Sequence, residues 1–266
     1  MITPRTIIIT GYGINCEEET KFAFEKAGAK AKIVHLTDLI EGDKSFKNYQ
    51  IAVFPGGFSF GDDTGSGKAL AHKFRHKMKE RLSQFVAGDN LVIGICNGFQ
   101  VLVNLGLVPA LNQSYEDRKV ALVHNDSARY IDRWVDLEFE EKSVWTQGIK
   151  RTSFPIAHGE GKFYAPREIL VQLQQKNLIA ARYVAGEMAA YQSLPANPNG
   201  SLEDIAAITD ESGRILGMMP HPERAIDFTQ LPHWTLLKEQ YKRNSQLLPL
   251  EGPGLKIFKN AVQYFL

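Results

Sequence analysis

The chain has 266 residues, 44% hydrophobic and 23% charged, which is enough to bury a substantial core as one large domain or two smaller ones. Its 31 Lys and Arg balance 30 Asp and Glu, without the basic excess of nucleic-acid-binding proteins, and no apolar run reaches the roughly 18 residues of a membrane span. Two cysteines are too few for a disulfide framework, so we expect a cytoplasmic protein. The charge balance and the absence of a long apolar run predict a globular protein that binds neither nucleic acid nor membrane.

The first half of the chain alternates between strand and helix patterns. In order, we expect a strand at 5–10, a helix at 17–29, a strand at 31–36, a strand running into a loop at 51–57, a long helix at 68–88, a strand at 90–95 and a helix at 97–106. Such alternation is typical of a parallel sheet covered by helices on both faces.

The pattern changes beyond about residue 115. Residues 119–125, 134–139, 153–159 and 178–184 read as strands without long helices between them, and residues 193–204 are rich in turn formers. Residues 205–210 and 214–220 then resemble a hairpin, and 254–265 a closing helix. We therefore predict an α/β fold with a mostly parallel sheet and an antiparallel elaboration.

The segment VIGICNGFQVL, residues 92–102, places Cys96 where a buried strand turns into a helix. Gly94 and Gly98 permit a sharp turn of the kind that exposes a nucleophile, and the helix N-terminus favours the reactive thiolate. Because ligands bind at the carboxyl ends of parallel strands, Cys96 is a candidate nucleophile. The residues alone leave open a buried structural cysteine between incidental glycines.

A thiol nucleophile needs a general base, and the base needs a group that orients it. His221 follows an apolar strand in GMMPHPERA, and Glu223 stands two positions later. Pro222 keeps His221 out of helical conformation, so both side chains can point to the same side of an extended segment. On local sequence a loop histidine beside a surface glutamate fits as well, because such short motifs recur by chance.

The glycine pair of VFPGGFSFGDD follows another buried strand and lets backbone approach a ligand closely. We expect the N–H groups of Gly57 and Asn97 to form an oxyanion hole, although the glycines taken alone favour a simple tight turn.

Nucleotide-binding loops are disfavoured. DTGSGKA departs from a P-loop at Asp62 and Ala69, and TGYGINCE departs from a dinucleotide fingerprint at Cys16 and puts acidic residues where a pyrophosphate would lie. We predict no metal site and no cofactor in this chain.

Seven motifs in order, from about residue 6 to about residue 230, carry a family resemblance. GINCE, PGGFSFGD, GICNGFQ, HNDSARY, PIAHGEGKF, NPNGS and GMMPHPER resemble the glutaminase subunits of phosphoribosylformylglycinamidine synthase, within the class I glutamine amidotransferases. The resemblance implies a flavodoxin-like fold in which residues 1–266 form one domain, lengthened by an insertion at about 229–254.

The resemblance also implies the chemistry. Cys96 would attack the side-chain amide of L-glutamine, His221 would relay the proton and Glu223 would orient His221. Gln100, one helical turn beyond Cys96, and the pair Asn125 and Ser127 would bind the substrate. Cys16 is interpreted as a packed small residue beside the site, and the roles of Arg129 and His158 stay open.

Converting an amide to an amidine needs ATP, which this chain shows no means of binding. The resemblance implies a separate synthetase subunit that holds ATP and Mg²⁺ and receives ammonia, with a small third subunit in some complexes. Two other classes remain: a stand-alone cysteine amidase or peptidase on a related fold, and a silent binding module. Intact Cys96, His221 and Glu223 argue against the second.

Overall fold

The computed structural model describes residues 3–42 and 44–266. Its strands are β1 (Arg5–Thr10), β2 (Lys30–His35), β3 (Ile51–Phe54), β4 (Leu91–Ile95), β5 (Ala121–Val123), β6 (Ile131–Phe139), β7 (Arg151–His158), β8 (Lys162–Tyr164), β9 (Ile179–Tyr183), β10 (Ile205–Thr209) and β11 (Ile215–Met218). Its α-helices are α1 (Glu17–Lys26), α2 (Leu36–Glu41), α3 (Lys68–Lys77), α4 (Lys79–Ala87), α5 (Asn97–Leu105), α6 (Arg167–Gln175), α7 (Glu187–Gln192), α8 (Trp234–Arg243) and α9 (Leu255–Gln263).

A nine-stranded sheet runs through the described residues in the order β2-β1-β3-β4-β11-β10-β9-β6-β7. The strands from β2 to β11 pair in parallel, and every pair beyond β11 is antiparallel. β5 and β8 form a separate two-stranded sheet. The predicted α/β class, with a parallel sheet and an antiparallel elaboration that includes the β10–β11 hairpin, is confirmed.

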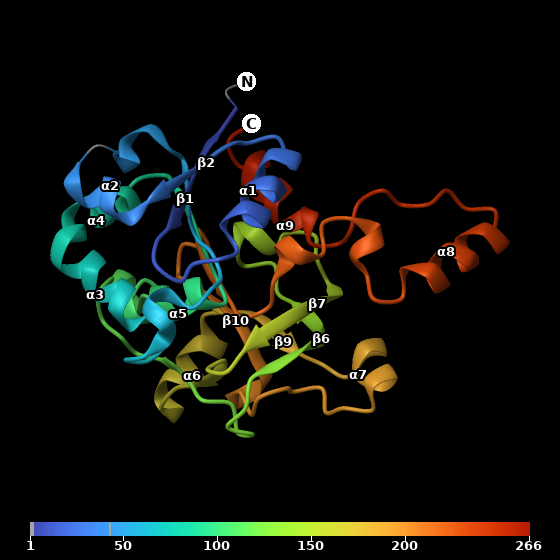
Figure 1. Ribbon diagram of the computed structural model, residues 1–266. Coiled ribbons are helices and arrows are strands. Elements are labelled where there is room, and N and C mark those ends of the chain that lie inside the picture. The colour runs from blue at the N-terminus through green and yellow to red at the C-terminus, as the bar shows by residue number, and fades with distance from the viewer. Residues whose placement is uncertain (1–2, 43) are drawn as a thin grey trace.

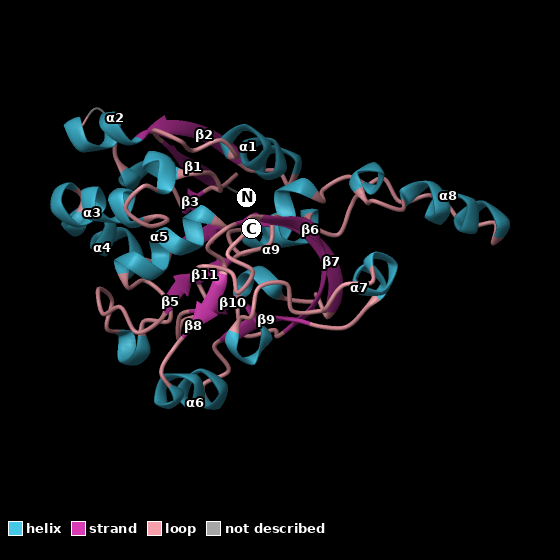
Figure 2. Ribbon diagram, turned by 60° about the horizontal axis from the view of Figure 1, so that its bottom comes forward, coloured by secondary structure: helices cyan, strands magenta, loops and turns pink. Residues whose placement is uncertain are grey.

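Helices cover both faces of the parallel half (Figures 1 and 2). On one face α1 packs on α9 through Phe24 and Phe258, whose ring centroids are 5.0 Å apart. On the other face Phe74 of α3 packs against Phe54 of β3, at 5.1 Å. Each such ring contributes about 2 kcal/mol or more by leaving water. The apolar strands are therefore buried on both sides, as their uninterrupted hydrophobic sequences predict.

The prediction of one long helix at 68–88 is wrong, because the chain forms two helices separated at Met78. Met78 has φ −132° and ψ 3°, outside the helical range. Phe74, Met78 and Leu82 are all buried. Since they are four residues apart, the apolar period continues across the break and conceals it.

Helix α6, nine residues long, lies in the segment expected to hold strands without long helices between them, and the sequence reading did not identify it. Its Ile169 and Leu173 are buried and lie four residues apart, directly after Pro166 at the helix start. That spacing and that proline are the local signals that predict a short amphipathic helix.

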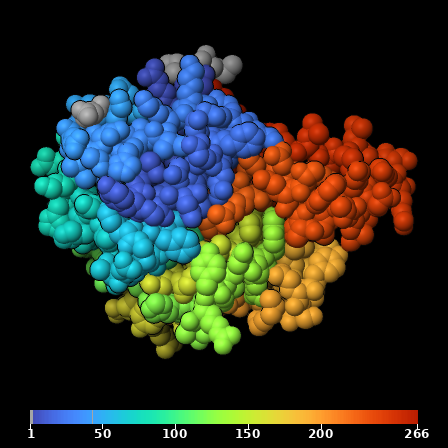
Figure 3. Space-filling view, in the orientation of Figure 1, coloured from blue at the N-terminus to red at the C-terminus, as the bar shows by residue number. Residues whose placement is uncertain are grey.

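Residues 231–250 project from the body and carry α8, as the orange-red arm in Figure 3 shows. This arm lies within the stretch 229–254 that the sequence suggested as an insertion, and α8 buries none of its residues. Within the described ranges, no helix is long and apolar enough to cross a membrane.

Gly98 is the residue whose replacement we expect to unfold the protein most readily. A Cβ at this position would lie 1.7 Å from the carbonyl oxygen of Phe54, so β3 and α5 would have to separate. We expect Gly98→Ala to lower the free energy of unfolding by about 3 kcal/mol or more in urea titrations. Gly159→Ala is the control, because a Cβ there meets no atom within 4 Å, and a comparable loss in that variant would contradict the packing argument.

Candidate active site

Four loops meet at one edge of the sheet because β1, β3, β4 and β11 are parallel and end together. The loops carry Cys16 after β1, Gly57 after β3, Cys96 after β4 and His221 after β11. The strand order reverses between β1 and β3, which is where open α/β sheets place their ligand crevice. The sheet therefore gathers residues that are up to two hundred positions apart in the chain.

Cys96 stands at a strained turn between β4 and α5. Its φ of 51° and ψ of −106° are unusual for a residue with a side chain, and such strain is tolerated mainly at functional sites. The backbone N–H is held by the Met218 carbonyl at 2.8 Å, and the thiol donates to the Ala157 carbonyl at 3.5 Å. A Cβ on Gly94 would lie 2.5 Å from the Gly98 carbonyl oxygen, so the flanking glycines make this turn possible.

His221 and Glu223 form a buried pair, each 1% exposed. The His221 Nδ1 lies 2.6 Å from a Glu223 carboxylate oxygen, while Nε2 is buried without a hydrogen-bond partner among the described residues. Burial acts to lower the pKa of His221, but the Glu223 carboxylate and the thiol of Cys96 hold that pKa well above its usual range. The imidazole is therefore a strong proton acceptor with one nitrogen available.

The turn after β3 presents the Gly57 N–H. Gly57 has φ 147°, and a Cβ there would lie 2.7 Å from the Gly13 carbonyl oxygen, so only glycine fits. The hydrogen bonds that fasten this turn are made by its neighbours: Asn15 N–H to Gly56 and Phe58 N–H to Gly13. Asn97 is the first residue of α5, where an N–H has no partner within the helix. Both N–H groups lie at the same edge of the sheet, one in the loop after β3 and one at the start of α5.

The amide of Gln100 is buried and joined to its surroundings. It accepts from Asn97 Nδ2 at 2.9 Å and donates to the Glu160 carbonyl oxygen. Asn97 Nδ2 also donates to Asp62 at 3.1 Å, and burial raises the pKa of that Asp62 carboxyl. A cavity of about 180 Å³ adjoins Gln100 and is lined by Lys68, Arg118 and Glu160 among others, so it carries charge of both signs.

Asn125 and Ser127 differ in what they can offer a substrate. Asn125 is buried, and its amide bonds the carbonyls of Arg129 and His158 and the backbone of Gly161 within 3.2 Å. Ser127 is exposed, and its hydroxyl accepts from the Arg129 N–H at 3.3 Å. The Asn125 amide therefore holds the loop together, whereas Ser127 is accessible.

His158, whose role the sequence left open, is part of the same region. Its Nδ1 lies 3.1 Å from the Asn125 side-chain oxygen, and it directly follows Ala157, whose carbonyl accepts the Cys96 thiol. Burial lowers the pKa of His158 to about 3, so the ring is neutral at physiological pH. It therefore adds no positive charge beside His221.

Sequence reasoning placed Cys16 beside the site but did not single out Arg224. Arg224 Nη2 donates to the Cys16 sulfur at 3.2 Å, and Arg224 Nε donates to Glu19 at 2.8 Å. The sequence signal for Cys16 was the motif GINCE, which follows β1 and therefore lies at the edge of the sheet where the parallel strands end.

Among the described residues, Cys16, His221 and Glu223 offer ligand atoms within 4.8 Å of one another, a separation compatible with a metal ion. The Arg224 guanidinium donates to the same sulfur, and the Glu223 carboxylate bonds the imidazole. A cation would have to displace the Arg224 guanidinium from the sulfur against its positive charge. It would also have to separate the Glu223 carboxylate from the imidazole. The arrangement fits an ion-paired catalytic group better than a metal site.

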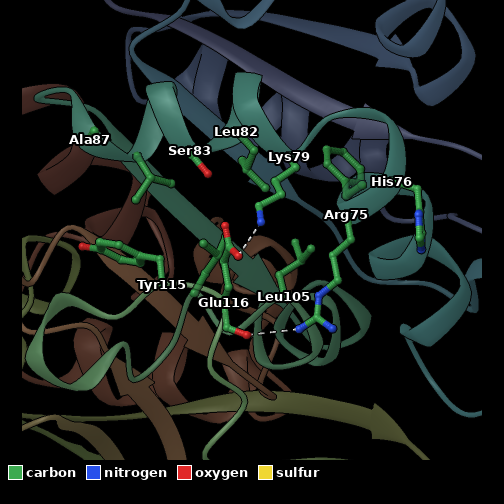
Figure 4. Close-up of a pocket in the computed structure, with 12 residues that line it drawn as sticks. Arg75, His76, Lys79, Leu82, Ser83, Ala87, Leu105, Tyr115 and Glu116 are labelled. Carbon is green, nitrogen blue, oxygen red and sulfur yellow. Dashed lines mark hydrogen bonds and ion pairs between the residues drawn. The ribbon is translucent and has the colours of Figure 1, made fainter.

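A separate apolar cavity of about 350 Å³ lies between α3, α4 and the segment after α5 (Figure 4). Lys79 and Arg75 at its rim both bond Glu116, the first through its side chain at 2.7 Å and the second through its carbonyl oxygen. The cavity borders Leu105, at the opposite end of α5 from Cys96, about 13 Å along the helix axis. It is therefore distinct from the cysteine site.

Comparison with known proteins identifies the family of the chain. The family model described as the CobB/CobQ-like glutamine amidotransferase domain matches residues 3–265. Phosphoribosylformylglycinamidine synthase subunit PurQ of Methanococcus maripaludis strain C5 is 47% identical over 268 residues, covering 99% of both chains. The protein of that name from Dehalococcoides mccartyi is 41% identical over 262 residues, covering 98% of this chain and 97% of its own.

A solved structure is similar over the whole chain. The structure of PurLQS from Thermotoga maritima contains a chain with a TM-score of 0.73 and 27% sequence identity, and the match covers 100% of both chains.

Proposed function

The chain belongs to the family of CobB/CobQ-like glutamine amidotransferase domains, and we propose that it is the glutaminase subunit of a phosphoribosylformylglycinamidine synthase. It hydrolyses L-glutamine and supplies ammonia for the conversion of formylglycinamide ribonucleotide to formylglycinamidine ribonucleotide in purine biosynthesis. The observation that carries the chemistry is a strained cysteine at the end of β4 beside a buried imidazole–carboxylate pair.

In the proposed mechanism, His221 Nε2 takes the Cys96 proton as the sulfur attacks the side-chain carbonyl carbon of glutamine. The carbonyl π electrons move to oxygen, and the N–H groups of Gly57 and Asn97 stabilise the resulting oxyanion. When the carbonyl re-forms, the C–N bond breaks and His221 returns its proton to the nitrogen. Ammonia leaves, and a glutamyl thioester remains on Cys96.

Water then completes the reaction. His221 accepts a proton from the water as its oxygen attacks the thioester, and collapse of the second tetrahedral species breaks the C–S bond. Glutamate is released and the proton returns to the sulfur. Glu223 holds the imidazole in the required orientation throughout and stabilises its protonated form.

Substrate contacts are part of the same proposal. The position of Gln100 one turn beyond Cys96, beside a cavity with charges of both signs, supports a role in binding glutamine. The exposure of Ser127 is compatible with such a role, whereas the internal bonds of Asn125 favour an indirect one.

We propose a synthetase subunit as the partner, because the PurLQS structure from Thermotoga maritima contains a similar chain. ATP and Mg²⁺ are expected in that partner, this chain needing neither for hydrolysis of an amide. A small third subunit is proposed on the same resemblance. The cytoplasmic location stays a prediction from sequence.

Partner dependence is the test of this function. An unpartnered glutaminase would waste glutamine, so we expect glutamate release by the isolated chain to rise about 100-fold or more when the synthetase and its substrates are added. The measurement is glutamate formed per minute with and without the synthetase. Equal turnover in both conditions would favour the stand-alone cysteine amidase, and turnover of unrelated peptides would favour a peptidase.

A further inference from the structure

The Cys16 thiol lies beside the imidazole–carboxylate pair, although the mechanism above gives it no role. We propose that Cys16 is a positioning residue for glutamine hydrolysis, whose sulfur holds the His221 imidazole where it can serve Cys96. This inference rests on the proposed function and assigns a task to a second cysteine.

Backbone hydrogen bonds fix Cys16 to the turn that presents the Gly57 N–H. The N–H groups of Asn15 and Cys16 both donate to the Gly56 carbonyl, at 3.4 and 3.2 Å, and the Phe58 N–H donates to Gly13 at 2.7 Å. Cys16 also begins α1, where its carbonyl accepts the Thr20 hydroxyl at 2.6 Å. The sulfur therefore projects from a rigid part of the edge.

The missing side chain of Gly56 shows where the sulfur and the imidazole meet. A Cβ on Gly56 would lie 2.8 Å from His221 Cε1 and 3.0 Å from the Cys16 sulfur. The sulfur and the imidazole therefore both border the position that a Gly56 side chain would occupy. Sulfur beside an aromatic ring is a favourable contact that can stabilise one ring orientation over another.

The thiol is itself held by its neighbours. It accepts from Arg224 Nη2 at 3.2 Å and donates to the Asn15 side-chain oxygen at 3.3 Å. Burial raises the pKa of Cys16, so the group stays a neutral thiol at physiological pH and does not compete with Cys96 for the His221 proton. The thiol nevertheless acts on the imidazole, because its presence raises the pKa of His221.

The pH dependence can be assigned to Cys16 only if the other groups that act on the charge of His221 are left unchanged. Besides Cys16, these are Cys96 after β4, Glu223 on the same loop, His158 of β7 and the partly exposed Tyr130, and Arg224 acts on both Cys16 and Tyr130. None of them is altered in the variants below.

The experiment compares three variants in the complex with the synthetase: Cys16→Ala, Cys16→Ser and Val262→Ala. Val262 is a buried residue of α9 that has no part in the site, so it controls for lost core volume. For each variant we measure kcat and KM for glutamine, the melting temperature, and the pH dependence of Cys96 alkylation by a diazoketone analogue of glutamine.

For Cys16→Ala we expect kcat to fall about tenfold or more, because a small displacement of a catalytic group is costly, with KM changing by less than about threefold. The alkylation midpoint should move to lower pH, because an imidazole with a lower pKa is unprotonated, and so able to accept the Cys96 proton, at lower pH. Cys16→Ser should recover part of both effects through its hydroxyl. Val262→Ala should lower the melting temperature with kcat unchanged.

The inference is overturned if Cys16→Ala retains wild-type kcat and pH dependence, or loses only stability as Val262→Ala does. It is also overturned if Cys16→Ser and Cys16→Ala are equally impaired with an unshifted alkylation midpoint, because the sulfur would then only fill space. A wild-type complex that neither hydrolyses glutamine nor becomes alkylated at Cys96 would instead refute the proposed function.

Discussion

Cys96→Ala is expected to lower glutamine hydrolysis by about 10⁴-fold or more, because no thioester can form without the sulfur. Synthesis driven by added ammonium salt should continue at the wild-type rate, since the synthetase then needs no glutaminase. The measurement is product formation by the complex with glutamine or with ammonium as the nitrogen source. Loss of both activities would indicate that the substitution disrupts the assembly rather than the chemistry.

Peptide mapping after labelling makes the assignment of the nucleophile independent of kinetics. A diazoketone analogue of glutamine should modify Cys96 in the wild type and leave Cys96→Ala unlabelled. Cys16 is the internal control, being the other cysteine of the chain and only 1% exposed. Modification at Cys16 in the wild type would reverse the assignment.

Glu223→Gln is expected to lower kcat by about 10³-fold, because an amide can hold the imidazole in the wrong tautomer and cannot stabilise its charge. The carboxylate raises the pKa of His221, so its removal lets that pKa fall. With a lower pKa, the imidazole stays unprotonated, and so able to accept the Cys96 proton, down to lower pH. The acidic limb of the kcat/KM profile, measured from about pH 6 to about pH 9, should therefore move toward lower pH.

Glu211→Gln provides the matched control for that change. Glu211 is a carboxylate paired with Lys176, away from the four loops of the site, so its replacement should leave kcat and the pH profile unchanged. If Glu223→Gln kept the wild-type acidic limb, the carboxylate would not be the group that sets the charge of His221.

Local sequence was sufficient where chemistry depends on neighbours in the chain. Gly94 and Gly98 stand two residues either side of Cys96 and signal a sharp turn; the turn itself requires glycine at 94, where a Cβ would meet the Gly98 carbonyl, whereas packing on Phe54 of β3 requires it at 98. His221 and Glu223 are two residues apart around Pro222, so their contact is also a local event. These features could be predicted as a nucleophile and as a base with its orienting group, although not as one site.

Local sequence failed where a pattern has two solutions. The apolar period through Phe74, Met78 and Leu82 is the same for one helix as for two, and only packing against the sheet decides that the chain bends at Met78. The substrate role of Asn125, which the resemblance implies, stays a prediction, and only the fold shows that its amide bonds the carbonyls of Arg129 and His158.

The sequence alone determined the β/α alternation, the turn at Cys96 and the pairing of His221 with Glu223, since each depends on residues a few positions apart. Only the tertiary structure decided that β1, β3, β4 and β11 end at one edge, and so brought Cys16, Gly57, Cys96 and His221 together. Strand order is set by burial of whole faces of the sheet. No local pattern records which distant loops will then be neighbours.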